Sequence, residues 1–78
     1  MRVRLFAALR ELAGASVVEV DDAGTVAEVL EELAGRFGPR FATIASAGSV
    51  VIDGERVDRD RSLSGNEEIA VLPPVSGG

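Results

Sequence analysis

The chain has 78 residues, a formal net charge of -5 at pH 7, and neither cysteine nor histidine. This length suits one domain, and the missing residue types exclude disulfides, thiolate or imidazole metal sites, and Cys-His or Ser-His nucleophile pairs. The negative charge argues against nucleic acid as a partner, because phosphates attract a basic surface. The hydrophobic content of 46% is that of a folded globular chain.

Residues 2–9 alternate in a way that predicts a β-strand. Its two faces would be Val3, Leu5 and Ala7 against Arg2, Arg4 and Phe6. A short connection ends at Gly14, and residues 16–20 predict a second strand, paired with the first as a hairpin with a wide loop. Arg10 and Glu11 interrupt the apolar run too early for a secretory or membrane segment. We therefore expect a soluble cytoplasmic protein with no membrane partner.

A helix is predicted to begin at Val26. Thr25 and Glu28 match a capping box, in which the threonine oxygen accepts the third amide of the helix and the glutamate reaches back. Apolar residues recur at i, i+3, i+4, i+7 and i+11, which places one stripe against a sheet. This stripe consists of Val26, Val29, Leu30, Leu33 and Phe37. Gly38 and Pro39 should end the helix.

The second half of the chain is again rich in β-formers. Residues 40–48 fit a loop or a short helical turn, with Phe41 and Ile44 as possible anchors. Residues 50–57 predict a hairpin around an Asp-Gly turn. Residues 67–72 predict the last strand, with Ile69 and Val71 on one face and Glu68, Ala70 and Leu72 on the other.

This order of elements predicts an α+β fold of the β-grasp type over residues 1–72. The sheet would be mixed, with about five strands, and one main helix would pack on one face. The last strand could run beside the first. Phe6, Ala70 and Leu72 would then gather on the face that the helix leaves uncovered, where Phe6 either caps the edge of the core or belongs to a docking surface.

Residues 73–78, Pro-Pro-Val-Ser-Gly-Gly, are predicted to form a flexible tail. Pro73 and Pro74 cannot donate to a sheet ladder, and their fixed φ favours an extended backbone. Gly77 and Gly78 lack a Cβ and fit a channel too narrow for side chains. Fully extended, six residues reach about 20 Å. The tail is either a frayed end, as many termini are, or a reactive end that threads into a partner.

The side chains themselves offer little chemistry. Paired carboxylates occur at 21–22, 31–32 and 67–68, but adjacent residues on a helix or strand do not point at one ligand. Residues 58–69 do not fit a calcium loop, because Leu63 stands at the sixth position, where glycine is required, and Ile69 at the twelfth, where glutamate is required. We therefore expect no metal site and no catalytic side chain, which leaves the terminal carboxylate of Gly78 as the group to activate.

Several motifs together resemble the MoaD/ThiS family of ubiquitin-like sulfur carriers, and within it MoaD, the small subunits of molybdopterin synthase. They are Phe6-Ala7 followed by Arg10-Glu11 and Gly14, the capped helix, the Asp53-Gly54 hairpin, and the ending Leu72-Pro73-Pro74-Val75-Ser76-Gly77-Gly78. Two turn residues depart from the family pattern: Asp53 stands where asparagine is frequent, and Asn66 where aspartate is usual.

The resemblance implies a carrier subunit of a sulfurtransferase complex, without catalytic residues or a bound cofactor of its own. A MoeB-like, E1-like enzyme would use ATP to adenylate Gly78, and sulfur would then replace the adenylate to give a thiocarboxylate. Residues Pro73, Pro74, Val75, Ser76 and Gly77 would thread into a MoaE-like large subunit, where the thiocarboxylate donates sulfur to cyclic pyranopterin monophosphate. Phe6, Ala70 and Leu72 would contact the partner.

Three other functions fit the same tail. The chain could be a carrier for thiamin or cysteine synthesis, since the same activated diglycine would serve. It could also be a ubiquitin-like modifier joined through Gly78 to lysines of other proteins, or a binding module that undergoes no reaction.

Overall fold

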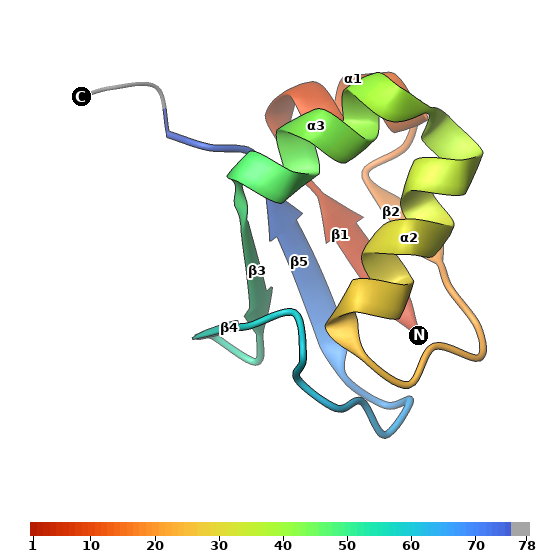
Figure 1. Ribbon diagram of the computed structural model, residues 1–78, viewed down its shortest axis with the longest axis vertical. Helices are drawn as coiled ribbons and strands as arrows, with labels where there is room; N and C mark the ends of the chain where they lie inside the picture. Colours follow the sequence, from red (N-terminus) through yellow and green to blue (C-terminus); the bar gives the residue numbers. More distant parts are fainter. Residues whose placement is uncertain (76–78) are drawn as a thin grey trace.

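The computed structural model describes residues 1–75 and places one layer of helices on one face of a sheet (Figure 1). The elements, in chain order, are β1 (Arg2–Leu5), α1 (Ala7–Ala13), β2 (Val17–Glu19), α2 (Val26–Phe37), α3 (Pro39–Ala47), β3 (Ser49–Ile52), β4 (Glu55–Val57) and β5 (Glu68–Leu72). The strand order is β2-β1-β5-β3-β4. The central pair β1 and β5 is parallel and the other pairs are antiparallel. The predicted α+β, β-grasp fold, with the last strand beside the first, is confirmed.

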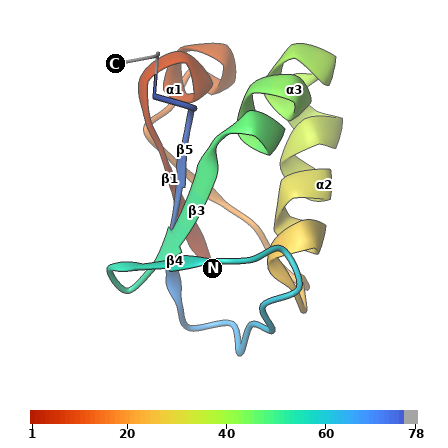
Figure 2. The same ribbon diagram turned by 60° about the vertical axis from the view of Figure 1, so that its left-hand side comes forward.

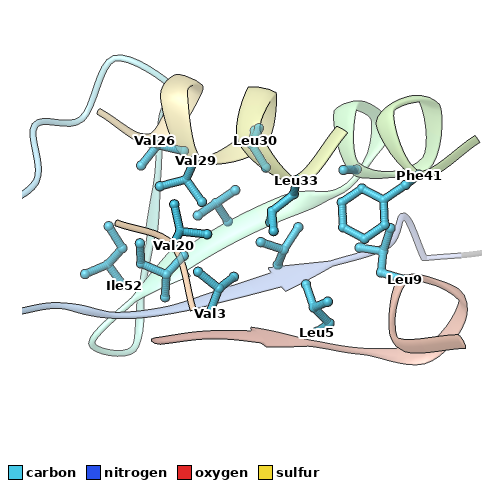
Figure 3. Close-up of a cluster of buried hydrophobic side chains, with 14 residues drawn as sticks. Val3, Leu5, Leu9, Val20, Val26, Val29, Leu30, Leu33, Phe41 and Ile52 are labelled. Atoms are coloured by element: carbon cyan, nitrogen blue, oxygen red, sulfur yellow. The ribbon is translucent and has the colours of Figure 1, made fainter. Parts of the chain in front are cut away.

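The core lies between the sheet and α2 (Figure 3). Alternate residues of β1, β3 and β5 point inward and meet the apolar stripe of α2. No polar or charged residue is buried within residues 1–75. The inward residues of the three strands are Val3, Leu5, Val50, Ile52, Ile69 and Val71, and those of the helix are Val26, Val29, Leu30 and Leu33.

The predicted strand over residues 2–9 is wrong in its second half. β1 ends at Leu5, and Ala7–Ala13 form α1, so Ala7 is not on the inward face of a strand. The sequence from Ala7 to Ala13 is Ala-Ala-Leu-Arg-Glu-Leu-Ala, in which every residue is a strong helix former. This helix propensity outweighs the alternation of side chains that predicted a longer strand. Leu9 fills the core from this helix, and Gly14 ends it with a left-handed φ of 74°.

A second correction concerns residues 40–48. The predicted main helix is α2, and α3 replaces the loop or short turn expected after it. Pro39 ends α2 but also begins α3, because proline lacks only an amide that the first turn does not use. Phe41, the expected anchor, is completely buried, and its ring centroid lies 5.3 Å from that of Phe37.

Local hydrogen bonds fix the ends of α2 and the β3–β4 turn. The Thr25 hydroxyl accepts the Glu28 amide at 3.3 Å, as predicted. The Glu28 carboxylate, however, accepts the amide of Gly24 at 2.5 Å and not that of Thr25. Asp53 and Gly54 both have positive φ, 50° and 84°, as the predicted two-residue hairpin turn requires.

Within residues 1–75, no helix has the length and apolar character needed to cross a membrane.

Candidate functional site: the open sheet face and the start of the tail

α2 and α3 cover one face of the sheet and leave the other open (Figure 2). The strand register shows which side chains share this open face. Arg4 of β1 lies opposite Ala70 of β5, and Ala70 lies opposite Val51 of β3. A shallow hollow on this face is lined by Arg4, Val51, Asp53, Gly54, Glu68 and Ala70.

The open face is charged at the end far from the tail. Arg2 is in register with Glu19 on one side and Glu68 on the other. Arg4 donates through Nε to Glu68 at 2.5 Å, in an ion pair whose two side chains are about half exposed. Such surface pairs contribute about 0–1 kcal/mol, so this end is a solvated surface with little effect on stability.

The opposite end of the open face is apolar, and here the structure brings the predicted partner-binding residues together. The last residue pair of the β1–β5 ladder is Leu5 and Val71. Phe6, which has an extended backbone, follows Leu5 on one side, and Leu72 follows Val71 on the other. Phe6 is 39% exposed, whereas Ala70 and Leu72 are half-buried. The three side chains therefore lie on one face, next to the point where the tail leaves. Their contact with a partner stays a prediction.

The last strand ends at Leu72, as the sequence predicts, whereas a flexible tail over residues 73–78 stays a prediction. β5 ends at Leu72, Pro73 is half-buried, and Pro74 and Val75 are exposed, Val75 by 95%. Figure 1 shows this segment leaving the sheet beside the junction of α3 and β3. Ser76, Gly77 and Gly78 lie outside the described residues, so the predicted threading positions there and the reactive carboxylate of Gly78 stay predictions.

One residue near the tail was missed by the sequence reasoning. Gly48 lies between α3 and β3, and a Cβ built on it would come within 1.9 Å of the Leu72 carbonyl oxygen. Its φ is -93°, which any residue can adopt, so the glycine is explained by space and not by backbone conformation. The sequence gives no local signal for this contact, because the two residues meet only through the sheet.

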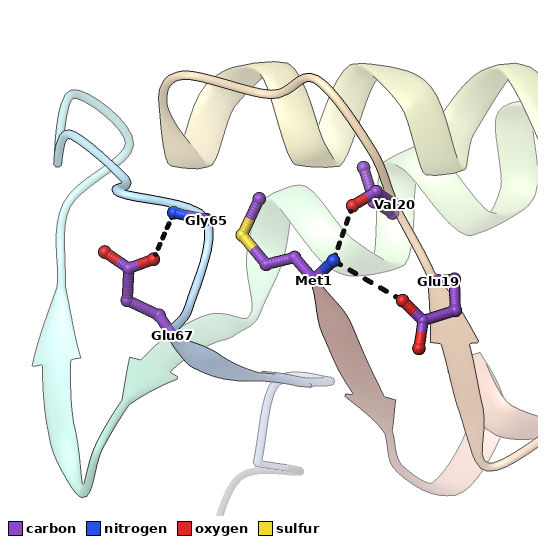
Figure 4. A network of polar contacts seen from close by, with 5 residues as sticks. All are labelled: Met1, Glu19, Val20, Gly65 and Glu67. Carbon is purple, nitrogen blue, oxygen red and sulfur yellow. Dashed lines mark hydrogen bonds and ion pairs between the residues drawn. The ribbon is translucent and has the colours of Figure 1, made fainter.

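Two carboxylates near strand ends make hydrogen bonds or ion pairs within the fold. Within residues 1–75, no group of acidic side chains could hold a metal ion. Glu67 accepts the amide of Ser64 at 2.7 Å and that of Gly65 at 2.9 Å, and Figure 4 shows the second of these bonds. The two hydrogen bonds, with Ser64 first, lower the pKa of Glu67 to about 2. Figure 4 also shows the Met1 ammonium group paired with Glu19. Both carboxylates therefore hold the ends of strands.

Comparison with known proteins decides the family. The model of the ThiS family matches residues 3–78. The chain belongs to the ThiS family. It is 30% identical to the molybdopterin synthase sulfur carrier subunit of Haemophilus influenzae, over 100% of this chain and 99% of the relative. It is 28% identical to the protein of the same name from Dictyostelium discoideum, over 99% and 94%. The chain is therefore a sulfur carrier of the ThiS/MoaD type.

Solved structures agree with this assignment. The solution structure of small archaeal modifier protein 1 from Methanosarcina acetivorans matches with a TM-score of 0.85 and 27% identity, covering 99% of this ThiS-family chain and 94% of that one. The crystal structure of the Haloferax volcanii protein SAMP1 matches with a TM-score of 0.77 and 31% identity, covering 99% and 97%. A chain of the Amycolatopsis orientalis BexX/CysO complex shares the fold, with a TM-score of 0.79, 22% identity and coverage of 99% and 98%.

Proposed function

We propose that this ThiS-family chain is the sulfur carrier subunit of a molybdopterin synthase. The observation that carries the proposal is the full-length similarity, at 30% and 28% identity, to two proteins named for that role. The geometry supports it, because a proline-led tail leaves the central strand beside an apolar patch on the open face. A cytoplasmic location, expected from the N-terminal sequence, is part of the proposal.

The proposed chemistry takes place at the terminal carboxylate of Gly78. A carboxylate is a poor acyl donor, because oxide is a poor leaving group. In the MoeB-like activating enzyme, one carboxylate oxygen attacks the α-phosphorus of ATP and pyrophosphate leaves. Hydrosulfide then attacks the acyl carbon, the bond to the AMP oxygen breaks, AMP departs with that electron pair, and the thioacid loses its proton to solvent. The product is a thiocarboxylate that donates its sulfur to cyclic pyranopterin monophosphate in the MoaE-like subunit.

The chain's own residues dock and deliver the tail. Phe6, Ala70 and Leu72 supply apolar contact area next to the tail, and residues 73–77 thread into the partner. Exposed apolar side chains that become buried in an interface often contribute most of its binding energy. The catalytic side chains belong to the partner enzymes, of which the activating enzyme uses ATP.

Intact-mass spectrometry tests the chemistry. The purified chain is incubated with a MoeB-like enzyme, ATP and a sulfide source, and we expect one oxygen of the chain to be exchanged for sulfur. A variant with one alanine added after Gly78 should keep its fold and gain no sulfur. Transfer is then followed as molybdopterin formed with a MoaE-like subunit. Sulfur gained equally by the extended variant would show that the reaction does not require the free carboxylate of Gly78.

A matched pair of substitutions tests the docking surface. Phe6→Asp places a charge on the apolar end of the open face, and Leu12→Asp places the same charge on a side chain of similar exposure, 36%, on α1. We expect Phe6→Asp to weaken binding to the large subunit at least about 30-fold, as a loss of 2 kcal/mol or more at a hot spot requires. Leu12→Asp should bind like the wild type. Equal affinities for all three proteins would remove Phe6 from the interface.

A ubiquitin-like modifier is the second candidate, favoured by the similarity to two proteins named or abbreviated as small archaeal modifiers. The same mass-spectrometric experiment separates the two functions, because a modifier would appear in larger conjugates through an amide bond from Gly78 to lysine. A carrier for thiamin or cysteine synthesis would gain sulfur but would not yield molybdopterin with a MoaE-like subunit.

A further inference from the structure

Gly48 lies where any side chain would collide with the base of the tail. A Cβ added there would lie 1.9 Å from the carbonyl oxygen of Leu72, 2.9 Å from its carbonyl carbon, and 3.1 Å from the carbonyl carbon of Pro73. All three atoms are backbone atoms, so no side chain can rotate away to make room. The oxygen would have to move by about 1 Å or more to reach the closest distance at which Cβ contacts occur.

The contact occurs beside the terminal residue pair of the β3–β5 ladder. Gly48 ends α3, donating its amide to the carbonyl of Ala45 at 3.1 Å, and the next residue, Ser49, pairs with Leu72. The chain thus leaves the sheet while packed against the α3–β3 junction. Pro73 is half-buried there, whereas Val75, two residues on, is 95% exposed. The direction of the described part of the tail is therefore set at Leu72 and Pro73.

We propose that Gly48 is a positioning residue, which aims the tail by leaving space for the backbone of Leu72 and Pro73. The inference rests on the proposed function, in which Gly78 must reach the active site of an activating enzyme. Two consecutive prolines transmit a change of direction, because they favour a stiff extended backbone that rises about 3.1 Å per residue. A misplacement of 1 Å far from the chemistry can cost about 100-fold in rate.

The test compares two glycine-to-alanine substitutions. Gly48→Ala adds the colliding methyl group, and Gly35→Ala adds the same group at an exposed position of α2, where nothing lies within 4 Å of the new Cβ. The initial rate of pyrophosphate release by the activating enzyme is measured over a range of carrier concentrations at 25 °C. We expect Gly48→Ala to lower kcat by about 10- to 100-fold with KM nearly unchanged, because the docking face remains. Gly35→Ala should match the wild type in both constants.

The separation of kcat from KM distinguishes positioning from a loss of stability. A partly unfolded carrier has a lower active concentration, which raises the apparent KM and leaves kcat at saturation unchanged. A Gly48→Ala protein with wild-type kcat, or with a raised KM alone, would therefore overturn the proposal. If the variant does not fold at 25 °C, Pro73→Gly is used instead. It removes the fixed φ at the base of the tail without adding an atom, and it should also lower kcat. A wild-type kcat for Pro73→Gly would equally overturn the proposal.

A second measurement needs no enzyme and keeps this inference separate from the proposed function. In ¹H–¹⁵N spectra, Gly48→Ala should shift the amide resonances of Ser49, Leu72 and Val75, whereas Gly35→Ala should shift only those of α2 and its neighbours. Unmoved resonances at Leu72 and Val75 would refute the steric argument.

The two proposals can fail independently. If even the wild-type chain is never adenylated, the proposed function is wrong. The chemical-shift changes would still show whether Gly48 directs the tail.

Discussion

Phe41 offers the sharpest test of how α3 contributes to the fold. Its side chain is completely buried, and Phe37, at the edge of the same cluster, is only partly buried. Phe41→Ala should lower the free energy of unfolding by about 3–5 kcal/mol, the usual cost of removing a buried phenylalanine. A chain of 78 residues has a total stability on the order of 4–12 kcal/mol, so this single change removes a large share of it.

Phe37→Ala is the matched control. The two rings contact each other at a centroid distance of 5.3 Å, so either substitution removes this aromatic pair, which is worth about 0.5–1.5 kcal/mol. The difference between the two variants then reports how much more the burial of Phe41 contributes to stability than the partial burial of Phe37. We expect Phe37→Ala to cost about 2 kcal/mol or less. Urea unfolding followed by far-UV circular dichroism at 25 °C gives both values. A Phe41→Ala cost no larger than that of Phe37→Ala would show that α3 does not complete the core.

Three further substitutions test local features. Thr25→Ala should lower stability by about 1 kcal/mol in urea unfolding, because it removes the oxygen that caps α2; an unchanged midpoint would contradict the cap. Gly35→Ala should raise stability by about 0.5–1 kcal/mol in the same assay, since alanine is the better helix former and meets no neighbour; any loss of stability would contradict the open space. Because the folded pKa of Glu67 is lowered from 4.5 to about 2, its contribution is present above pH 4.5 and lost as the pH falls toward 2. Unfolding experiments from pH 7 to 2.5 should therefore find Glu67→Gln less stable than the wild type at pH 7, with a difference that shrinks in acid; a constant difference would refute the assignment.

The sequence predicts the elements whose local signals agree with their tertiary role. The α2 stripe, the cap at Thr25 and the Asp53-Gly54 turn all appear where the pattern places them, because propensity, periodicity and turn chemistry point the same way there. The alternation of β5 likewise predicts its buried residues, Ile69 and Val71.

The errors occur where two signals compete. After Leu5 the alternation continues through Phe6 and Ala7 by chance, while the helix-forming run from Ala7 to Ala13 decides the outcome. At Pro39, a residue that ends one helix also begins the next, and the spacing of Phe41, Ile44 and Ala45 then gives α3 a core-facing side.

The candidate site also contains residues that the sequence predicts and one residue that it does not. The strand phase of Phe6, Ala70 and Leu72, combined with the expected pairing of first and last strands, was enough to place them on one face. Gly48 could not be found this way, because its role depends on an atom of Leu72 that is brought close only by the finished sheet. The chemistry proposed for the tail rests on family membership, because the proposed reactive group is the terminal carboxylate and not a side chain.

The position of β5 in the centre of the sheet has a mechanical consequence. An enzyme that draws the tail inward pulls along β5, which is bonded to β1 on one side and β3 on the other. Because the inter-strand bonds lie across the direction of pull, both ladders bear the load together in shear. A tail attached to the edge strand β4 would instead place the same load on a single ladder, the one with β3. Stretching single molecules from the tail should therefore require a higher force than stretching them from β4, and the carrier can be held firmly by its end without being unravelled.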